Sequence, residues 1–166
     1  MKNNPILRII SKTLFAPIIL YGLYVQFHGD FGPGGGFQAG VIIAAAFILY
    51  GMVFSLDELK LLAPPSIVHA LMALGALIYA GVGIATFLLG AEFLNYDVLA
   101  DYPAKGQHYG IILVEFGVGL TVASTILGLF MAFAGFDIPR YSAREKDAKP
   151  ANKAGAKSPK KRASDD

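Results

Sequence analysis

Long apolar runs separated by short polar stretches make up most of the first 139 residues of the chain. A helix that spans a membrane needs about 20 predominantly apolar residues, and four stretches reach that length. We expect spanning helices at about residues 5–27, 34–54, 66–90 and 110–136. The hydrophobic pattern therefore predicts an all-α, polytopic membrane protein with four transmembrane helices.

Polar residues and prolines interrupt this pattern at informative places. Pro17 lies inside the first expected helix, where it removes a backbone hydrogen bond and predicts a kink. Arg8 and Lys12 lie one turn apart near the start of that helix, where long side chains can reach the headgroups. Ser55 to Glu58 fits a helix capping box. It predicts a short helix on the membrane surface, which the following Pro-Pro pair ends.

The entrance of the second expected helix is rich in glycine. Glycines allow backbone conformations that a Cβ forbids, and a proline fixes one of them, so this segment predicts a tight reversal at the membrane surface. The segment consists of Gly32, Pro33, Gly34, Gly35, Gly36 and Phe37. Gly36, Gly40 and Ala44 follow one another at four-residue steps, the spacing that lets a second helix approach closely. The N–H groups at this helix end offer an anion or carbonyl site as an alternative, but no P-loop sequence follows. We favour the packing and turn role.

Charge is concentrated at the end of the chain, where nine of the 14 Lys and Arg residues fall from Arg140 onward. We expect two parts: a transmembrane domain at 1–139 and a disordered basic C-terminal tail at 140–166. With both termini in the cytoplasm, the loops on the outer side hold only Lys105 of all the Lys and Arg residues. This asymmetry predicts that orientation. The tail is either a topology signal or a contact for anionic lipid headgroups, and we favour lipid contact.

Several classes of function find no support in the sequence. The basic tail on a nearly neutral body does not suggest nucleic-acid binding, and the chain has no cysteine for a disulfide or a thiolate metal site. The motifs of zinc hydrolases, serine hydrolases and Asp-rich phosphotransferases are missing. We therefore expect no enzyme activity, no cofactor and no resident metal.

Glu115 is the only carboxylate inside an expected spanning helix, several ångströms below its outer end. An ionised carboxylate in a membrane needs a partner or water, and such residues often mark ion pathways. The alternative is a protonated Glu that hydrogen-bonds across a helix interface, because burial favours the neutral acid. The residues alone leave both alternatives open.

Three weaker candidates for an ion path lie elsewhere. His69 falls in the first turn of the third helix, where a solvated or capping role is more common. Lys12 is better explained as an anchor that reaches the headgroups. Asp30 lies beside the glycine segment in an outer loop, on a side whose carboxylates attract cations.

A specific resemblance appears at His28-Gly29 and from Pro33 to Ala46. The sequence Pro-Gly-Gly-Gly-Phe at the entrance of the second spanning segment, in a small four-helix protein, resembles the MnhB (MrpB) family of small subunits of the multisubunit Mrp-type Na⁺/H⁺ antiporters. The resemblance covers about Arg8 to Phe136, and the tail lies outside it.

The resemblance implies a small component of a plasma-membrane complex of six or seven proteins, which exchanges cytoplasmic Na⁺ for external H⁺ using the proton-motive force. Its implied partners are the other antiporter subunits, including large ones similar to the proton-pumping subunits of respiratory complex I. The chain would assemble the complex, with the lining of part of a cation route as a further role.

Two alternatives remain. One is a purely structural scaffold of another membrane complex, without ion contact. The other is a small channel formed by copies of this chain, against which the lack of a file of charged residues argues.

Overall fold

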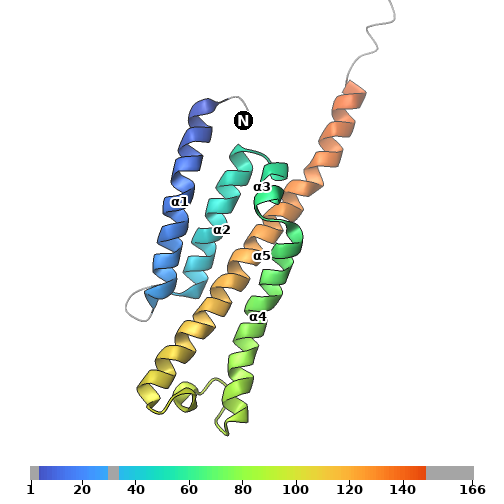
Figure 1. Ribbon diagram of the computed structural model, residues 1–166. Helices are drawn as coiled ribbons and strands as arrows, with labels where there is room; N and C mark the ends of the chain where they lie inside the picture. The colour runs from blue at the N-terminus through green and yellow to red at the C-terminus, as the bar shows by residue number, and fades with distance from the viewer. Residues whose placement is uncertain (1–3, 30–33, 149–166) are drawn as a thin grey trace, which may run out of the picture.

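The computed structural model describes residues 4–29 and 34–148, and for residues 136–148 it describes the backbone alone. All regular elements of the described chain are helical (Figure 1): α1 (Pro5–Phe27), α2 (Gly36–Val53), α3 (Leu56–Leu62), α4 (Pro65–Leu88), the 3₁₀ helix η2 (Tyr96–Leu99) and α5 (Pro103–Ala148). Four of them are long and apolar enough to cross a membrane, namely α1, α2, α4 and residues 103–135 of α5. The prediction of an all-α protein with four spanning helices is confirmed.

Local sequence explains where the shorter elements begin and end. The Ser55 hydroxyl accepts a hydrogen bond from the backbone N–H of Glu58 at 3.3 Å, so Ser55 caps the start of α3 as the sequence predicts. Pro65 occupies the first position of α4, where the missing N–H has no helical partner to lose. The chain therefore stops α3 and starts α4 within three residues.

Helix α5 is longer than the sequence predicts at both of its ends. It begins at Pro103, inside the expected polar loop, because proline is well suited to the first turn of a helix. It also continues through residues 140–148, where we expect disorder, because Ala, Arg, Glu and Lys in this stretch are good helix formers. The rest of the predicted tail, residues 149–166, lies outside the described residues.

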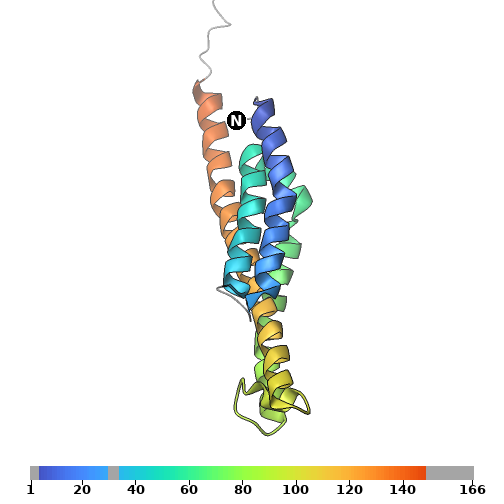
Figure 2. The ribbon, with the colours of Figure 1, turned by 90° about the vertical axis from the view of Figure 1, so that its left-hand side faces the viewer.

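Helix α5 is the centre of the arrangement, with α2 and α4 packed against it and α1 packed mainly on α2 (Figures 1 and 2). The Phe15 ring of α1 meets the Phe47 ring of α2 edge-on, with centroids 5.2 Å apart. The start of α1 and the C-terminal end of α5 lie at the same end of the molecule, as four crossings require (Figure 1). Their cytoplasmic location stays a prediction.

The short helix α3 fills the end of the bundle where α2 turns into α4. Its Leu59 is fully buried in a cluster with Val68 of α4 and with Leu127 and Met131 of α5. The long helices, in contrast, leave large apolar side chains exposed, including Leu77 and Phe133. Such surfaces suit contact with lipid or with other membrane subunits.

The α1–α2 pair and the α4–α5 pair are offset from each other along the length of the molecule. Gly36, the first residue of α2, lies against Glu115 of α5, whereas Gly75, near the middle of α4, lies against Gly117. Residues 103–114 of α5, about 18 Å of helix, therefore extend beyond the α1–α2 pair together with the second half of α4 (Figure 1). We call residues 76–114 the α4–α5 arm.

Aromatic residues close the end of the α4–α5 arm. Phe93 packs over Gly83, and the Tyr96 ring packs over Gly110. The buried hydroxyl of Thr86 accepts a hydrogen bond from the backbone N–H of Leu94 at 3.0 Å. Burial and the nearby Tyr79 raise the pKa of Tyr96 above its ordinary value, so this phenol stays neutral at physiological pH.

Candidate functional site

The half-buried Glu115 lies where the α1–α2 connection meets α5. A Cβ placed on Gly29 would meet both carboxylate oxygens of Glu115, with the carboxyl carbon at 2.9 Å. A Cβ placed on Gly35 would lie 3.0 Å from Oε1 of the same carboxylate. The carboxylate is thus in contact with glycine backbone on both sides of the connection. We call its described glycines, Gly29, Gly34, Gly35 and Gly36, the glycine elbow.

The glycine elbow fixes this position through its backbone. Gly35 has a φ of +146°, which a residue with a side chain rarely adopts, and it is the cap of α2. At the next position, a Cβ on Gly36 would strike the carbonyl oxygen of Glu115 and lie 3.0 Å from the backbone nitrogen of Gly119. Helix α2 therefore begins in backbone contact with α5 at the residue that carries the carboxylate.

Two glutamines lie on the helices that meet α5 near Glu115. Gln26 of α1 is 7% exposed, and its side-chain oxygen faces Gly119, one turn along α5 from Glu115. The side-chain oxygen of Gln38 lies 3.7 Å from a Cβ placed on Gly35. Carboxylate and amide oxygens are the ligands that hard cations take. In the described chain, no group of three or more His, Cys, Asp or Glu residues could hold a metal ion.

Glu115 lies deeper along its helix than the sequence predicts. The expected helix start at residue 110 places the carboxylate within two turns of the end, whereas the observed start at Pro103 places it 12 residues, or about 18 Å, from that end. The apolar sequence of α5 begins at about residue 110, after the polar residues 103–109, and continues to residue 135. Glu115 thus lies in the second turn of this apolar stretch, level with the first residue of α2.

The other candidates for an ion path are not brought to Glu115. Lys12 is exposed on α1, one turn before Phe15, which packs against Phe47 in the half of α2 that leads to α3. His69 is exposed in the first turn of α4 and lines a small cavity of about 220 Å³ at the α3 end of the bundle. Asp30 lies outside the described residues.

Of the residues predicted to form the turn and the helix packing, some contact another helix and one lies at the surface. Gly40 lies against Gly119 and Val122, Ala44 is buried, and Phe37 is 60% exposed. Gly34 contacts Val25 of α1. Gly32 and Pro33 lie outside the described residues. Pro17 lies inside α1, and the kink stays a prediction.

Sequence reasoning missed the contact between Gln26 and Gly119. A signal was present, because Gly22 and Gln26 are one turn apart on α1 and a helix face with a glycine beside a polar residue favours a helix interface. Both residues are buried. The partner on α5 could not be read from α1, because it lies some 90 residues further along the chain.

Comparisons with known proteins indicate a family for the chain. A family model described as "Domain related to MnhB subunit of Na+/H+ antiporter" matches residues 6–128. The chain is 34% identical over 137 residues to "Putative antiporter subunit mnhB2" of Staphylococcus haemolyticus, a match that covers 81% of this chain and 96% of the relative. The protein of the same description from Staphylococcus aureus strain Newman is 32% identical with the same coverage. The matched region includes the glycine elbow and Glu115.

Proposed function

Because this chain belongs to the family of domains related to the MnhB subunit of Na⁺/H⁺ antiporters, we propose that it serves a multisubunit antiporter in which Glu115 contacts the transported ion. The chain is a multi-pass protein of the plasma membrane and a transporter component rather than an enzyme. In our proposal the complex exchanges cytoplasmic Na⁺ for external H⁺ using the proton-motive force. Large subunits similar to those of complex I carry the main proton path.

The observation that carries this proposal is the close approach of the glycine elbow to the half-buried Glu115 carboxylate. Cβ atoms placed on Gly29 and Gly35 would lie no more than 3.0 Å from a carboxylate oxygen, so the glycine backbone approaches the carboxylate closely from both positions. A carboxylate can hold either a proton or a sodium ion, and the two compete for one negative charge. Exchange requires a group that Na⁺ and H⁺ neutralise in turn. A full negative charge is costly in an apolar span, so binding of either ion to the carboxylate is favoured.

The test is a Glu115→Gln substitution in the whole complex. Gln keeps the shape of the side chain and loses the exchangeable charge, so we expect normal assembly and loss of Na⁺-driven proton movement in everted membrane vesicles. Glu92→Gln is the matched control, because Glu92 is exposed in the α4–α5 arm. Wild-type exchange by the Glu115→Gln complex would remove Glu115 from the ion path.

A purely structural role is the second candidate, favoured by the close helix contacts at Gly36 and Gly75. In that case Glu115 is a neutral acid that hydrogen-bonds across the contact with α2. A scaffold would tolerate Glu115→Gln and would lose assembly when a large side chain replaces Gly36. The two substitutions together therefore separate the candidates.

A further inference from the structure

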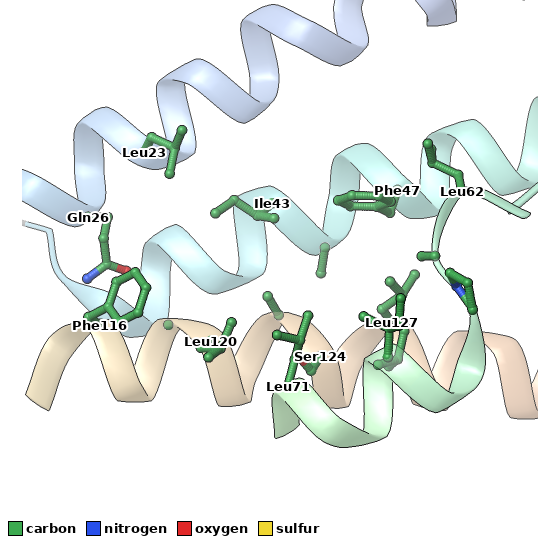
Figure 3. A pocket seen from close by; sticks show the side chains of 17 residues that line it. Leu23, Gln26, Ile43, Phe47, Leu62, Leu71, Phe116, Leu120, Ser124 and Leu127 are labelled. Carbon is green, nitrogen blue, oxygen red and sulfur yellow. The ribbon is translucent and has the colours of Figure 1, made fainter. Parts of the chain in front are cut away.

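The short helix α3 borders a larger and a smaller cavity, which differ in the charge of their linings. The larger cavity, of about 320 Å³, is lined by apolar side chains apart from Gln26 and Ser124 (Figure 3). The smaller cavity, of about 220 Å³, is lined by Lys60 of α3 and His69 of α4 together with apolar residues of α4 and α5. We call it the Lys60 cavity. It has a charged side chain that can recognise an anion, and the lining of the larger cavity has none.

The Lys60 cavity lies at the level where the spanning helices end. Helix α2 ends just before α3, and α4 begins just after it at Pro65, so Lys60 lies between the ends of two spans. On α5 the cavity is lined at Gly128 and Ala132, within two turns of residue 135, where the part of α5 that can span a membrane ends. Three elements therefore place this cavity at the boundary between the hydrocarbon core and the headgroups.

Lys60 lacks an acidic partner in the part of the chain that the structure describes. Its side chain is half-buried and makes no ion pair or hydrogen bond there. Asp57 and Glu58 of the same helix are exposed and do not line the cavity. A partly desolvated ammonium group is costly without an opposite charge nearby. The cavity therefore favours a negatively charged ligand.

We propose that the Lys60 cavity binds the phosphate group of a negatively charged phospholipid from the leaflet that faces α3. The Lys60 ammonium supplies the charge, and a ring N–H of His69 can donate a hydrogen bond to a phosphate oxygen. Basic pockets between transmembrane helices at the membrane surface bind such headgroups. The proposal goes beyond the assignment to an antiporter and does not depend on ion contact at Glu115.

A phospholipid fits the lining better than a free phosphate ion does. Besides the two basic residues, the cavity presents the apolar side chains of Val68 and Met131. A free phosphate leaves these side chains uncovered, whereas the glycerol and the first acyl carbons of a lipid cover them. The exposed Leu129 and Phe133 of α5 are then available to the acyl chains.

The experiment uses the whole complex, reconstituted in vesicles with a tracer lipid that carries a diazirine next to its headgroup. The tracer is phosphatidylglycerol in one preparation and phosphatidylcholine in the other. After irradiation, mass spectrometry maps the adducts. We expect phosphatidylglycerol to label α3 and the start of α4 several-fold more than phosphatidylcholine does. Equal labelling by the two lipids would overturn the proposal, and so would loss of the labelling in an excess of inorganic phosphate, because the cavity would then take the free ion.

Substitutions of lysine separate the cavity from a general attraction of lipids to basic residues. We expect Lys60→Gln to lower the labelling by phosphatidylglycerol about fivefold and Lys60→Arg to keep most of it. Lys12→Gln is the matched control, because Lys12 is an exposed lysine in the same half of the molecule. An equal loss with Lys12→Gln would contradict the proposal.

A further outcome tests for a protein group in place of the lipid. If a carbodiimide joins Lys60 to a carboxylate of a neighbouring protein in the complex, that carboxylate occupies the cavity and the proposal is wrong. If Lys60→Gln prevents assembly, the comparison of the two lipids in the unsubstituted complex still decides.

Discussion

Helix α5 makes two close contacts with its neighbours, and they differ in one respect. In the contact between α2 and α5, which we call the α2 seam, Gly36 and Gly40 pack against the backbone of α5 at Glu115 and Gly119. In the contact between α4 and α5, which we call the α4 seam, a Cβ on Gly75 would lie 2.6 Å from the carbonyl oxygen of Gly117 and 2.8 Å from the backbone nitrogen of Thr121. Both seams bring backbones together through small residues, as membrane helices do. Only the α2 seam carries a carboxylate.

The α4 seam shows that close packing on α5 needs no ionisable group. Its polar side chain, Thr121, donates a hydrogen bond at 2.9 Å to the carbonyl of Gly117 in its own helix. An ionisable Glu115 in the α2 seam costs free energy because it lies in an apolar span. Close packing alone does not require such a group. Substitutions in the α4 seam therefore serve as controls that show the purely structural effect of disturbing a close contact with α5.

The largest expected effect comes from breaking either seam with a bulky side chain. Gly36→Leu and Gly75→Leu each force a side chain into the backbone of α5, at a cost of about 3 kcal/mol or more. We expect the amount of assembled complex, measured by native gel and immunoblot, to fall at least tenfold, as ~1.4 kcal/mol already implies. Gly81→Leu is the control, because nothing lies within 4 Å of a Cβ at Gly81. Normal assembly with Gly36→Leu would mean that the α2 seam is not needed for assembly.

A second pair of substitutions removes one polar group from each seam without adding bulk. Glu115→Gln should keep assembly and lose exchange, whereas Thr121→Val should keep both, because the Thr121 hydroxyl donates its hydrogen bond within its own helix and Val has the same shape where this side chain packs on Gly75. Na⁺-dependent quenching and recovery of a pH-sensitive dye in vesicles measures the exchange. A similar loss of exchange in both variants would show that the seams do not differ in function.

A smaller effect is expected from Gly29→Ala. The new methyl group meets the Glu115 carboxylate, the mobile end of a side chain, so the carboxylate moves while the backbone stays. We expect normal assembly and a half-saturating Na⁺ concentration raised roughly three- to tenfold, equivalent to about 0.7–1.4 kcal/mol. The Na⁺ dependence of exchange measures it. An unchanged value would place the ion away from this side of the carboxylate.

The smallest effect is a gain in stability from Gly128→Ala. A Cβ on Gly128 would make only ordinary contacts, at 3.7 Å to Met72 and 3.8 Å to Val68, and Ala favours the helix by at most about 1 kcal/mol. A thermal denaturation series on the purified complex should show a slightly raised midpoint. Gly119→Ala, by contrast, should lower it, because its methyl group meets Gln26. A lowered midpoint for Gly128→Ala would contradict the contacts described for α5.

The sequence predicts the helices well because their signals are local. The expected α1 agrees with Pro5–Phe27 at both ends, and the start of α3 follows from the Ser55 capping box. The ends of α5 were missed because hydropathy marks an apolar core, whereas Pro103 and the helix formers after residue 139 extend the helix into polar sequence.

The offset between the helix pairs and the surroundings of Glu115 were not predictable in this way. Hydropathy gives the length of each span and no information on how spans are aligned along one another. The contacts of Glu115 with Gly29, and of Gln26 with Gly119, join positions far apart in sequence. Glu115 itself could be singled out, because a lone carboxylate in an apolar run is visible in the sequence.

The offset of the α4–α5 arm has a consequence for membrane thickness. The 18 residues of α2 correspond to about 27 Å and match a hydrocarbon core of about 30 Å, whereas the apolar residues 110–135 of α5 correspond to about 39 Å. Hydrophobic mismatch costs a fraction of a kcal/mol per ångström, so roughly 9 Å of excess length amounts to about 1–4 kcal/mol if the bilayer alone must adapt. Tilting of the arm, or protein that covers it, relieves this strain. Mismatch between the two halves of one small chain can thus act as a driving force for assembly.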